Sequence, residues 1–230
     1  MREGRGGIGG AASGVLLVLS LVVLVHLGAQ LRGAEGLADA TQVMLMPLLL
    51  IALLVEAAPP RGRLVGLFAL GLMLSWLGDT LPRFLDRQAQ FLAMLGCFLL
   101  AQLVYAAALW PLRRDSLRRV AVLPYGVAGT VIVVLCAPAA GALLPALVLY
   151  AAAICTMAVL ATTLGRRGVL GGALFVLSDA LIALETFGVL TLPVHAFWVM
   201  LTYVAAQNLL VLGVLDRHGY RSRDGAWAAE

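Results

Sequence analysis

Charged residues are scarce in this sequence. They make up 12% of its 230 residues, against about 25% in soluble domains, whereas hydrophobic residues reach 62%. A water-soluble globule of this composition would expose more apolar surface than soluble proteins tolerate. The same apolar excess excludes a disordered chain, a collagen and a disulfide-stapled secreted domain. We therefore expect an integral membrane protein.

Lysine is absent and cysteine is rare. All 16 basic residues are arginines, and the three cysteines, Cys97, Cys136 and Cys155, lie far apart in apolar runs. No spacing typical of a zinc or iron–sulfur site is present, and no glycine-rich loop stands in the strand–turn–helix context of a phosphate site. We expect no metal, no cofactor and no nucleic-acid partner.

Long apolar runs are abundant. About 18–22 residues of α-helix cross a hydrocarbon core of roughly 30 Å, and the runs do not alternate as the strands of a membrane barrel do. Short polar or proline- and glycine-containing breaks separate the runs. The eight predicted helices are residues 15–31, 40–57, 64–81, 88–110, 120–137, 141–164, 169–190 and 194–215.

The arginines predict the orientation of these helices. With eight spans, 13 arginines fall on the side of the N-terminus and 3 on the other side, which is the bias of cytoplasmic loops. We predict an all-α integral membrane protein with eight transmembrane helices, short loops and both termini in the cytoplasm. One domain, residues 15–215, lies between tails at residues 1–14 and 216–230. The predicted location is the cell membrane, which is the cytoplasmic membrane in a bacterium.

Two aspartates fall inside the predicted spans. Ionisable groups at membrane depth cost roughly 2.5–3.5 kcal/mol on insertion scales and are functional candidates by default. Asp79 lies about 22 Å and Asp179 about 16 Å from the inner end of its helix, so the two can share one layer. Ser75 lies one helical turn below Asp79, and Ser178 directly precedes Asp179. These four residues are the first candidates for a site.

Other polar residues lie at compatible depths. Tyr203 and Gln207 are one turn apart in the last run, Gln102 and Tyr105 are one turn apart in the fourth, and Gln42 lies near the height of Asp79. They are expected to support or bind a substrate. The alternative is hydrogen bonding between helices, worth on the order of 1 kcal/mol each.

Two carboxyl groups that share an apolar pocket resist ionising together, so one can hold a proton while the other is a carboxylate. Such a pair suits hydrolysis of an acid-labile bond, because one group donates a proton and the other orients water. Apolar walls suit a single-chain lipid that enters from the bilayer. The same pair could instead bind a cation or relay protons in a transporter, and a lipid-binding protein without turnover is a third possibility.

Several motifs together resemble the YhhN-type membrane proteins, the lysoplasmalogenase family. The resemblance covers roughly residues 40–213 and depends on the order and spacing of the motifs. They are Met46-Pro47-Leu48-Leu49, Ser75-x-x-Gly78-Asp79, Phe91, Phe98, Tyr105, Tyr150, Met157, Gly171-Gly172-x-x-Phe175-x-x-Ser178-Asp179, Ala183, Phe187 and Tyr203-x-x-x-Gln207.

The resemblance implies hydrolysis of the vinyl-ether bond of a lysoplasmalogen, to a fatty aldehyde and a glycerophospho-ethanolamine or -choline. Asp79 and Asp179 would be the catalytic residues, and the partner would be a lysophospholipid or another single-chain lipid. Two positions depart from the family pattern. Gln42-Val43 stands where the family carries Lys-Pro, and Gln102 stands where it often carries His. These changes would alter headgroup recognition or proton transfer, so another ether or ester lysolipid is a further possible substrate.

Overall fold

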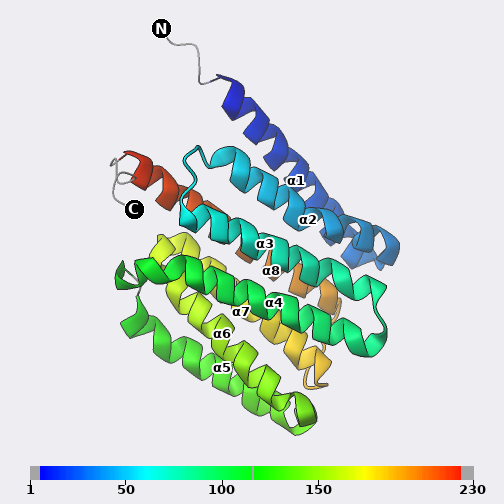
Figure 1. The fold of residues 1–230 in the computed structure, drawn as a ribbon. Coiled ribbons are helices and arrows are strands. Elements are labelled where there is room, and N and C mark those ends of the chain that lie inside the picture. The colour runs from blue at the N-terminus through cyan, green and yellow to red at the C-terminus, as the bar shows by residue number, and fades with distance from the viewer. Residues whose placement is uncertain (1–5, 116, 224–230) are drawn as a thin grey trace. The chain divides into compact units, whose positions relative to one another are not determined.

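The computed structural model describes residues 6–115 and 117–223, and every regular element within them is helical (Figure 1). The all-α prediction is therefore confirmed. The elements are α1 (Gly6–Arg32), α2 (Glu35–Glu56), α3 (Arg63–Thr80), η1 (Leu81–Phe84), α4 (Arg87–Leu109), η2 (Trp110–Asp115), α5 (Arg118–Ala140), η3 (Gly141–Leu143), α6 (Leu144–Ala161), η4 (Thr162–Leu164), α7 (Gly165–Thr186) and α8 (His195–Arg223).

The predicted number of eight membrane spans needs correction. In the described chain, six helical segments are long and apolar enough to cross a membrane. The difference arises in residues 119–186, which form one unbroken helical segment of 68 residues. The 3₁₀ turns η3 and η4 join α5, α6 and α7 without any extended residues between them. The predicted orientation of the termini stays a prediction.

Several helices extend beyond the apolar runs that predicted them. Helix α1 begins at Gly6 and α8 ends at Arg223, so parts of the predicted tails, residues 1–14 and 216–230, are helical. Residues 1–5 and 224–230 of those tails lie outside the described residues. An apolar run marks the hydrocarbon core, whereas backbone hydrogen bonding continues into the headgroup region. This explains why apolarity alone places the start of α1 and the end of α8 too far inward.

Glycines make the tightest turns. Gly33, Gly141 and Gly165 have φ values of 65°, 50° and 68°, a region that side chains with a Cβ rarely adopt. The break predicted at residues 138–141 carries no charge, and the chain turns there: α5 runs through Pro138 to Ala140 before η3 begins. The turn between α5 and α6 therefore depends on the positive φ that Gly141 adopts.

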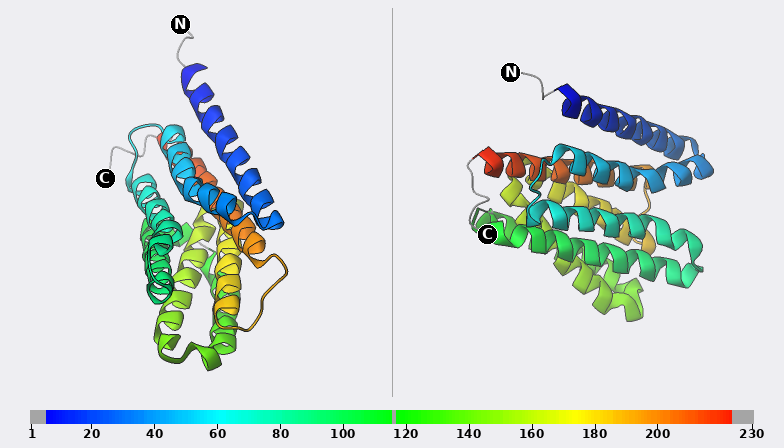
Figure 2. Two further views of the ribbon diagram at one scale, coloured as in Figure 1. Left: turned by 90° about the vertical axis from the view of Figure 1, so that its right-hand side faces the viewer. Right: turned by 45° about the horizontal axis from the view of Figure 1, so that its top comes forward.

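The chain divides into two compact units. Unit 1 contains residues 1–101 and 214–230, and unit 2 contains residues 102–213. Within unit 1, α2 packs against both α1 and α3. Within unit 2, α6 packs against both α5 and α7, and Figure 2 shows the turn that joins α5 to α6 in green and yellow-green. A single domain over residues 15–215 stays a prediction.

Large apolar side chains are exposed along the helices. Leu17 and Leu24 of α1 are 70% and 69% exposed, and Val120 and Leu123 of α5 are 74% and 73% exposed. Such surfaces are rare on soluble proteins, whereas lipid chains solvate them at no cost. Together with the long apolar helices, they identify a membrane protein.

Candidate functional site

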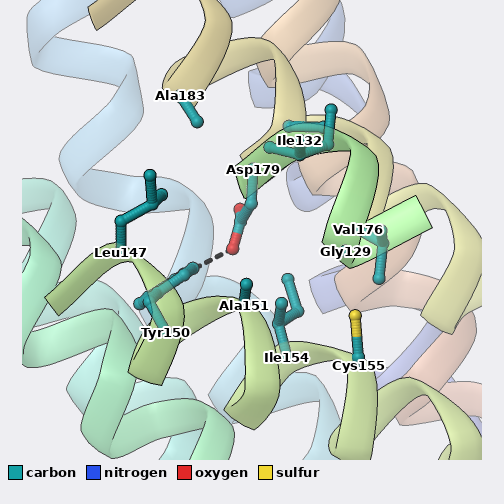
Figure 3. Close-up of a pocket in the computed structure, with 11 residues that line it drawn as sticks. Gly129, Ile132, Leu147, Tyr150, Ala151, Ile154, Cys155, Val176, Asp179 and Ala183 are labelled. Atoms are coloured by element: carbon teal, nitrogen blue, oxygen red, sulfur yellow. Dashed lines mark hydrogen bonds between the residues drawn. The ribbon is translucent and has the colours of Figure 1, made fainter. Parts of the chain in front are cut away.

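Asp179 lies in a pocket of unit 2. The hydroxyl of Tyr150 on α6 donates a hydrogen bond to Oδ2 of Asp179 on α7, and Figure 3 shows the two side chains pointing toward each other. Helices α5, α6 and α7 supply the walls. The lining residues are Gly129, Ile132, Leu147, Tyr150, Ala151, Ile154, Cys155, Val176, Asp179, Ala180 and Ala183.

The pocket is small and largely apolar. Its volume of about 40 Å³ holds a few water molecules, so a lipid chain has to lie outside it. The residues that line it include no basic side chain. A carboxyl group among such walls needs polar partners, and Tyr150 supplies one. The arrangement therefore places an acidic group and room for water beside apolar surfaces.

Close packing of glycines fixes the position of α7. A Cβ on Gly171 would lie 3.0 Å from Cγ of Leu210 on α8, and one on Gly172 would lie 3.1 Å from the backbone of Ala158 on α6. The Gly-Gly pair therefore allows α7 to approach α6 and α8 closely. Asp179 lies two helical turns further along the same helix.

Ser178 joins two helices. It is buried, and its hydroxyl donates a hydrogen bond of 3.1 Å to the carbonyl oxygen of Val199 on α8. This bond satisfies the hydroxyl within the protein, as in other interhelical contacts of membrane proteins. The bond ties α7, the helix that carries Asp179, to α8; a supporting role of Ser178 at Asp179 stays a prediction.

Two of the predicted polar residues meet across helices. The hydroxyl of Tyr105 on α4 donates a hydrogen bond of 3.0 Å to Oε1 of Gln207 on α8, and both side chains are buried. Tyr203, one turn from Gln207, packs edge-to-face on Phe175 of α7 with ring centroids 5.7 Å apart. These contacts support interhelical bonding for Tyr105 and Gln207, and they place Tyr203 beside α7.

Gln102 is the least satisfied of the predicted site residues. Its side chain is fully buried, and in the described part of the chain neither amide atom has a hydrogen-bond partner of normal geometry. The amide lies near the hydroxyl of Tyr150. An unsatisfied buried polar group costs about 1–3 kcal/mol. Gln102 therefore leaves polar capacity next to the Tyr150–Asp179 pair.

Asp79 lies in a polar network of unit 1. Nε2 of Gln42 donates to Oδ1 of Asp79 at 3.3 Å, which brings these two predicted site residues together. Arg83 donates to Oε1 of Gln42 at 2.9 Å and to the backbone oxygen of Asp79 at 3.2 Å, and it pairs with the carboxylate of Asp39. The network joins the adjacent ends of α2 and α3.

Ser75 and Gly78 lie on the buried side of α3. Ser75 is fully buried one turn from Asp79. A Cβ on Gly78 would lie 2.9 Å from the ring of Phe98 on α4, so Gly78 allows that aromatic ring to pack against α3. The indole of Trp76 donates to the backbone oxygen of Val43 at 3.0 Å, which ties α3 to α2 beside Gln42.

The two aspartates belong to different units, and a pocket shared by them stays a prediction. Residue-by-residue reasoning missed Tyr150 and Arg83 as direct members of the two clusters. The sequence could have indicated Tyr150, because it is a polar side chain within an apolar helix. It gave little indication of Arg83, because an arginine just past a predicted span looks like a solvated charge.

Among the described residues, no group of three or more His, Cys, Asp or Glu side chains is placed to hold a metal ion. The two clusters consist of carboxyl, hydroxyl and amide groups, with the Arg83 guanidinium added in unit 1.

Comparison with known proteins agrees with the motifs. A search of curated proteins and a search of solved structures gave no match. The model of the YhhN family matches residues 37–214, close to the range of roughly 40–213 expected from the motifs. This match contains both aspartates, Tyr150 and the paired glycines of α7. The chain therefore belongs to the YhhN family.

Proposed function

We propose that this protein hydrolyses the vinyl-ether bond of a lysoplasmalogen or a closely related single-chain ether lipid within the cell membrane. The observation that carries the proposal is the Asp179 carboxyl group, hydrogen-bonded by Tyr150 in an apolar pocket between α5, α6 and α7. Family membership supports it, because the YhhN family is broadly associated with hydrolase activity. Aldehyde and glycerophospho-ethanolamine or -choline are the products.

The chemistry needs one proton donor and one water molecule. Protonation of the β-carbon of the vinyl ether gives an oxocarbenium ion, and water adds to its α-carbon with loss of a proton. The resulting hemiacetal collapses to an aldehyde and the free glycerol hydroxyl. The net change is one water consumed per bond broken. General acid–base catalysis of such proton transfers contributes typically about 10²–10⁴-fold.

Each residue of the unit 2 pocket has a role in this proposal. Asp179 carries the transferred proton or stabilises the cation, and Tyr150 fixes the orientation of the carboxyl group. The few water molecules that fit in the pocket supply the nucleophile. Asp79 keeps its predicted role as a second carboxyl group required for turnover, held by Gln42. The buried amide of Gln102, which lies next to the Tyr150 hydroxyl, supports the Tyr150–Asp179 pair.

We further propose that α5, α6 and α7, which together form the segment of residues 119–186, cross the membrane separately. They contain 23, 18 and 22 residues, and at 1.5 Å per residue these lengths are roughly 35, 27 and 33 Å. Each is close to the thickness of a hydrocarbon core, which is about 30 Å. A single straight crossing of 68 residues would be far too long.

A transporter that uses the same aspartates is the main alternative. Transporter sites typically lie at helices broken by proline or glycine near the middle of the membrane. Helix α7 is continuous past Asp179, whereas α3 ends at Thr80, one residue after Asp79. Neither helix contains an internal proline. The unbroken helix at Asp179 favours the hydrolase over the transporter.

Product analysis tests the proposal. Purified protein in detergent is incubated with vinyl-ether, alkyl-ether and acyl lysophospholipids of equal chain length, and mass spectrometry measures released aldehyde and fatty acid. We expect aldehyde from the vinyl-ether lipid alone. Fatty acid from the acyl lipid would overturn the assigned bond while keeping a lipid hydrolase. No product from any lipid, with folded protein, would contradict the proposal and favour transport or lipid binding.

A further inference from the structure

A second cavity of unit 2 lies outside the Asp179 pocket. It is a groove between α5 and α6 with a volume of about 370 Å³, within the range of roughly 300–1,000 Å³ that small-molecule sites have. The end of α4 closes one side of it through η2. The lining residues are Trp110, Arg113, Val122, Tyr125, Gly126, Ala152, Cys155, Thr156, Val159 and Leu160.

One end of the groove is basic and aromatic. Arg113 donates a hydrogen bond of 3.2 Å to the backbone oxygen of Trp110, and its guanidinium carbon lies 5.0 Å from the centre of the indole ring. These contacts hold the guanidinium on the lining of the groove. A guanidinium can donate two parallel hydrogen bonds to the oxygens of one phosphate. Tryptophan is enriched at the headgroup level of membranes.

The rest of the groove is shaped for a chain. A Cβ on Gly126 would meet no atom within 4 Å, so the absence of a side chain there leaves open space beside α6. Valine, leucine and alanine line the neighbouring wall. An apolar channel with one cation at its end complements a molecule with one apolar chain and one anionic headgroup.

We propose that this groove binds a single-chain phospholipid, with its phosphate on Arg113 and its chain over Gly126 toward Cys155. Cys155 lines both the groove and the Asp179 pocket, and its thiol donates to the backbone oxygen of Tyr125 at 3.2 Å. The Cys155 side chain therefore lies between the two cavities, next to the path of the chain.

The groove captures the lipid before cleavage rather than during it. The Arg113 end lies toward Val159 and Leu160, because η2 packs against η4 at that end of α6. Val159 and Tyr150 are nine residues apart, roughly 14 Å along the helix. Only the three-carbon glycerol backbone separates the phosphate of a lysolipid from its ether bond. A lipid held at Arg113 therefore has to move deeper before that bond reaches Asp179.

This inference rests on the proposed function only in treating the captured lipid as a substrate. Binding is measured without turnover, through the Cys155 thiol. A Cys97→Ala/Cys136→Ala background leaves Cys155 as the single thiol. The rate of its modification by a membrane-permeant maleimide is followed in maltoside detergent, against increasing alkyl-ether lysophosphatidylcholine or the corresponding alkylglycerol without phosphate.

We expect the lysophospholipid to slow modification at least fivefold at saturation, and the alkylglycerol to need about tenfold more for the same protection. Arg113→Gln should raise the half-protecting lysophospholipid concentration about tenfold. Arg114→Gln is the matched control, because Arg114 is exposed and does not line the groove. Gly126→Leu should fill the groove and abolish protection, whereas Gly66→Leu, at another open glycine, should not.

Equal protection by the two lipids, or equal shifts in the two arginine variants, would overturn the capture site. Melting temperatures of the variants identify any that fail to fold. The comparison of lysophospholipid with alkylglycerol, in the protein that keeps Arg113 and Arg114, tests the capture site without those variants. If the lysophospholipid protects the Cys155 thiol but neither the parent protein nor Asp179→Asn cleaves the vinyl-ether lipid, the groove is supported and the proposed hydrolysis is contradicted. If the parent protein cleaves the lipid but Cys155 is not protected, the hydrolysis is supported and the groove is contradicted.

Discussion

The two intramembrane aspartates have different surroundings. Asp79 lies in a network with Gln42, Arg83 and, through Arg83, Asp39. Asp179 receives a hydrogen bond from the neutral hydroxyl of Tyr150 in a pocket whose lining includes no basic side chain. One residue type therefore has two environments. The Asp79 carboxyl group accepts a hydrogen bond from an amide that the Arg83 guanidinium also binds, which suits a fixed position. A carboxyl group held by a hydroxyl beside a small cavity suits proton transfer.

Asp179→Asn gives the largest expected effect. The amide keeps the shape and still accepts the Tyr150 hydrogen bond, but it carries no acidic proton. Because general acid–base groups contribute about 10²–10⁴-fold, we expect kcat for vinyl-ether cleavage to fall at least 100-fold. The melting temperature should change by only a few degrees.

Full activity in purified, folded Asp179→Asn would remove this residue from the mechanism. Asp79→Asn is the matched comparison in unit 1. We expect it also to abolish turnover, and a variant that keeps full activity would restrict the chemistry to the unit 2 pocket.

Tyr150→Phe sharpens the comparison, because it removes the hydroxyl and leaves both aspartates. A hydrogen bond of this kind has a net worth of about 1 kcal/mol, so we expect kcat to fall about five- to tenfold with KM little changed. Steady-state kinetics on the vinyl-ether lysolipid measure the two constants. Thr130→Val is the control, because it removes an exposed α5 hydroxyl that does not line the pocket; an equal loss there would show a general effect of removing hydroxyls.

Arg83→Gln breaks the unit 1 network and should have the smallest effect. The guanidinium is about three-quarters buried, but its Asp39 partner is exposed, and exposed ion pairs contribute only about 0–1 kcal/mol. We expect the melting temperature to fall by a few degrees and the fall to shrink at high salt, since salt screens the pair in the parent protein. Arg32→Gln, at an exposed arginine, is the thermal-denaturation control; a salt-independent loss in Arg83→Gln would show that ion pairing contributes little.

The lengths of the apolar runs in the sequence predict most of the helices. Each of the eight apolar runs corresponds to one α-helix. This includes α5 and α6, which are separated only by the uncharged break near Gly141. The continuity of residues 119–186 is not predictable from polarity, because residues 165–168, which include two arginines, look like a loop in the sequence but form the start of α7. The helix ends at Gly6 and Arg223 also lie beyond the apolar runs, because glycine-rich residues in α1 and polar residues in α8 continue the helical hydrogen bonding.

The candidate site is predictable in part. Depth along the helices places Gln42 near Asp79, and a hydrogen bond joins them. Depth does not give the rotation of one helix against another, so the partner of Asp179 could not be chosen among Tyr105, Tyr150 and Tyr203. For the same reason the sequence does not show that Ser178 turns its hydroxyl to Val199 of α8.

Isotope transfer from solvent tests the central claim most directly. The purified protein cleaves vinyl-ether lysolipid in D₂O, the aldehyde is trapped at once, and mass spectrometry measures its deuterium content. Protonation of the β-carbon by Asp179 predicts one deuterium on the carbon next to the aldehyde group, with no such product from Asp179→Asn. Aldehyde that carries no deuterium, or labelled aldehyde at full rate from Asp179→Asn, would contradict the account.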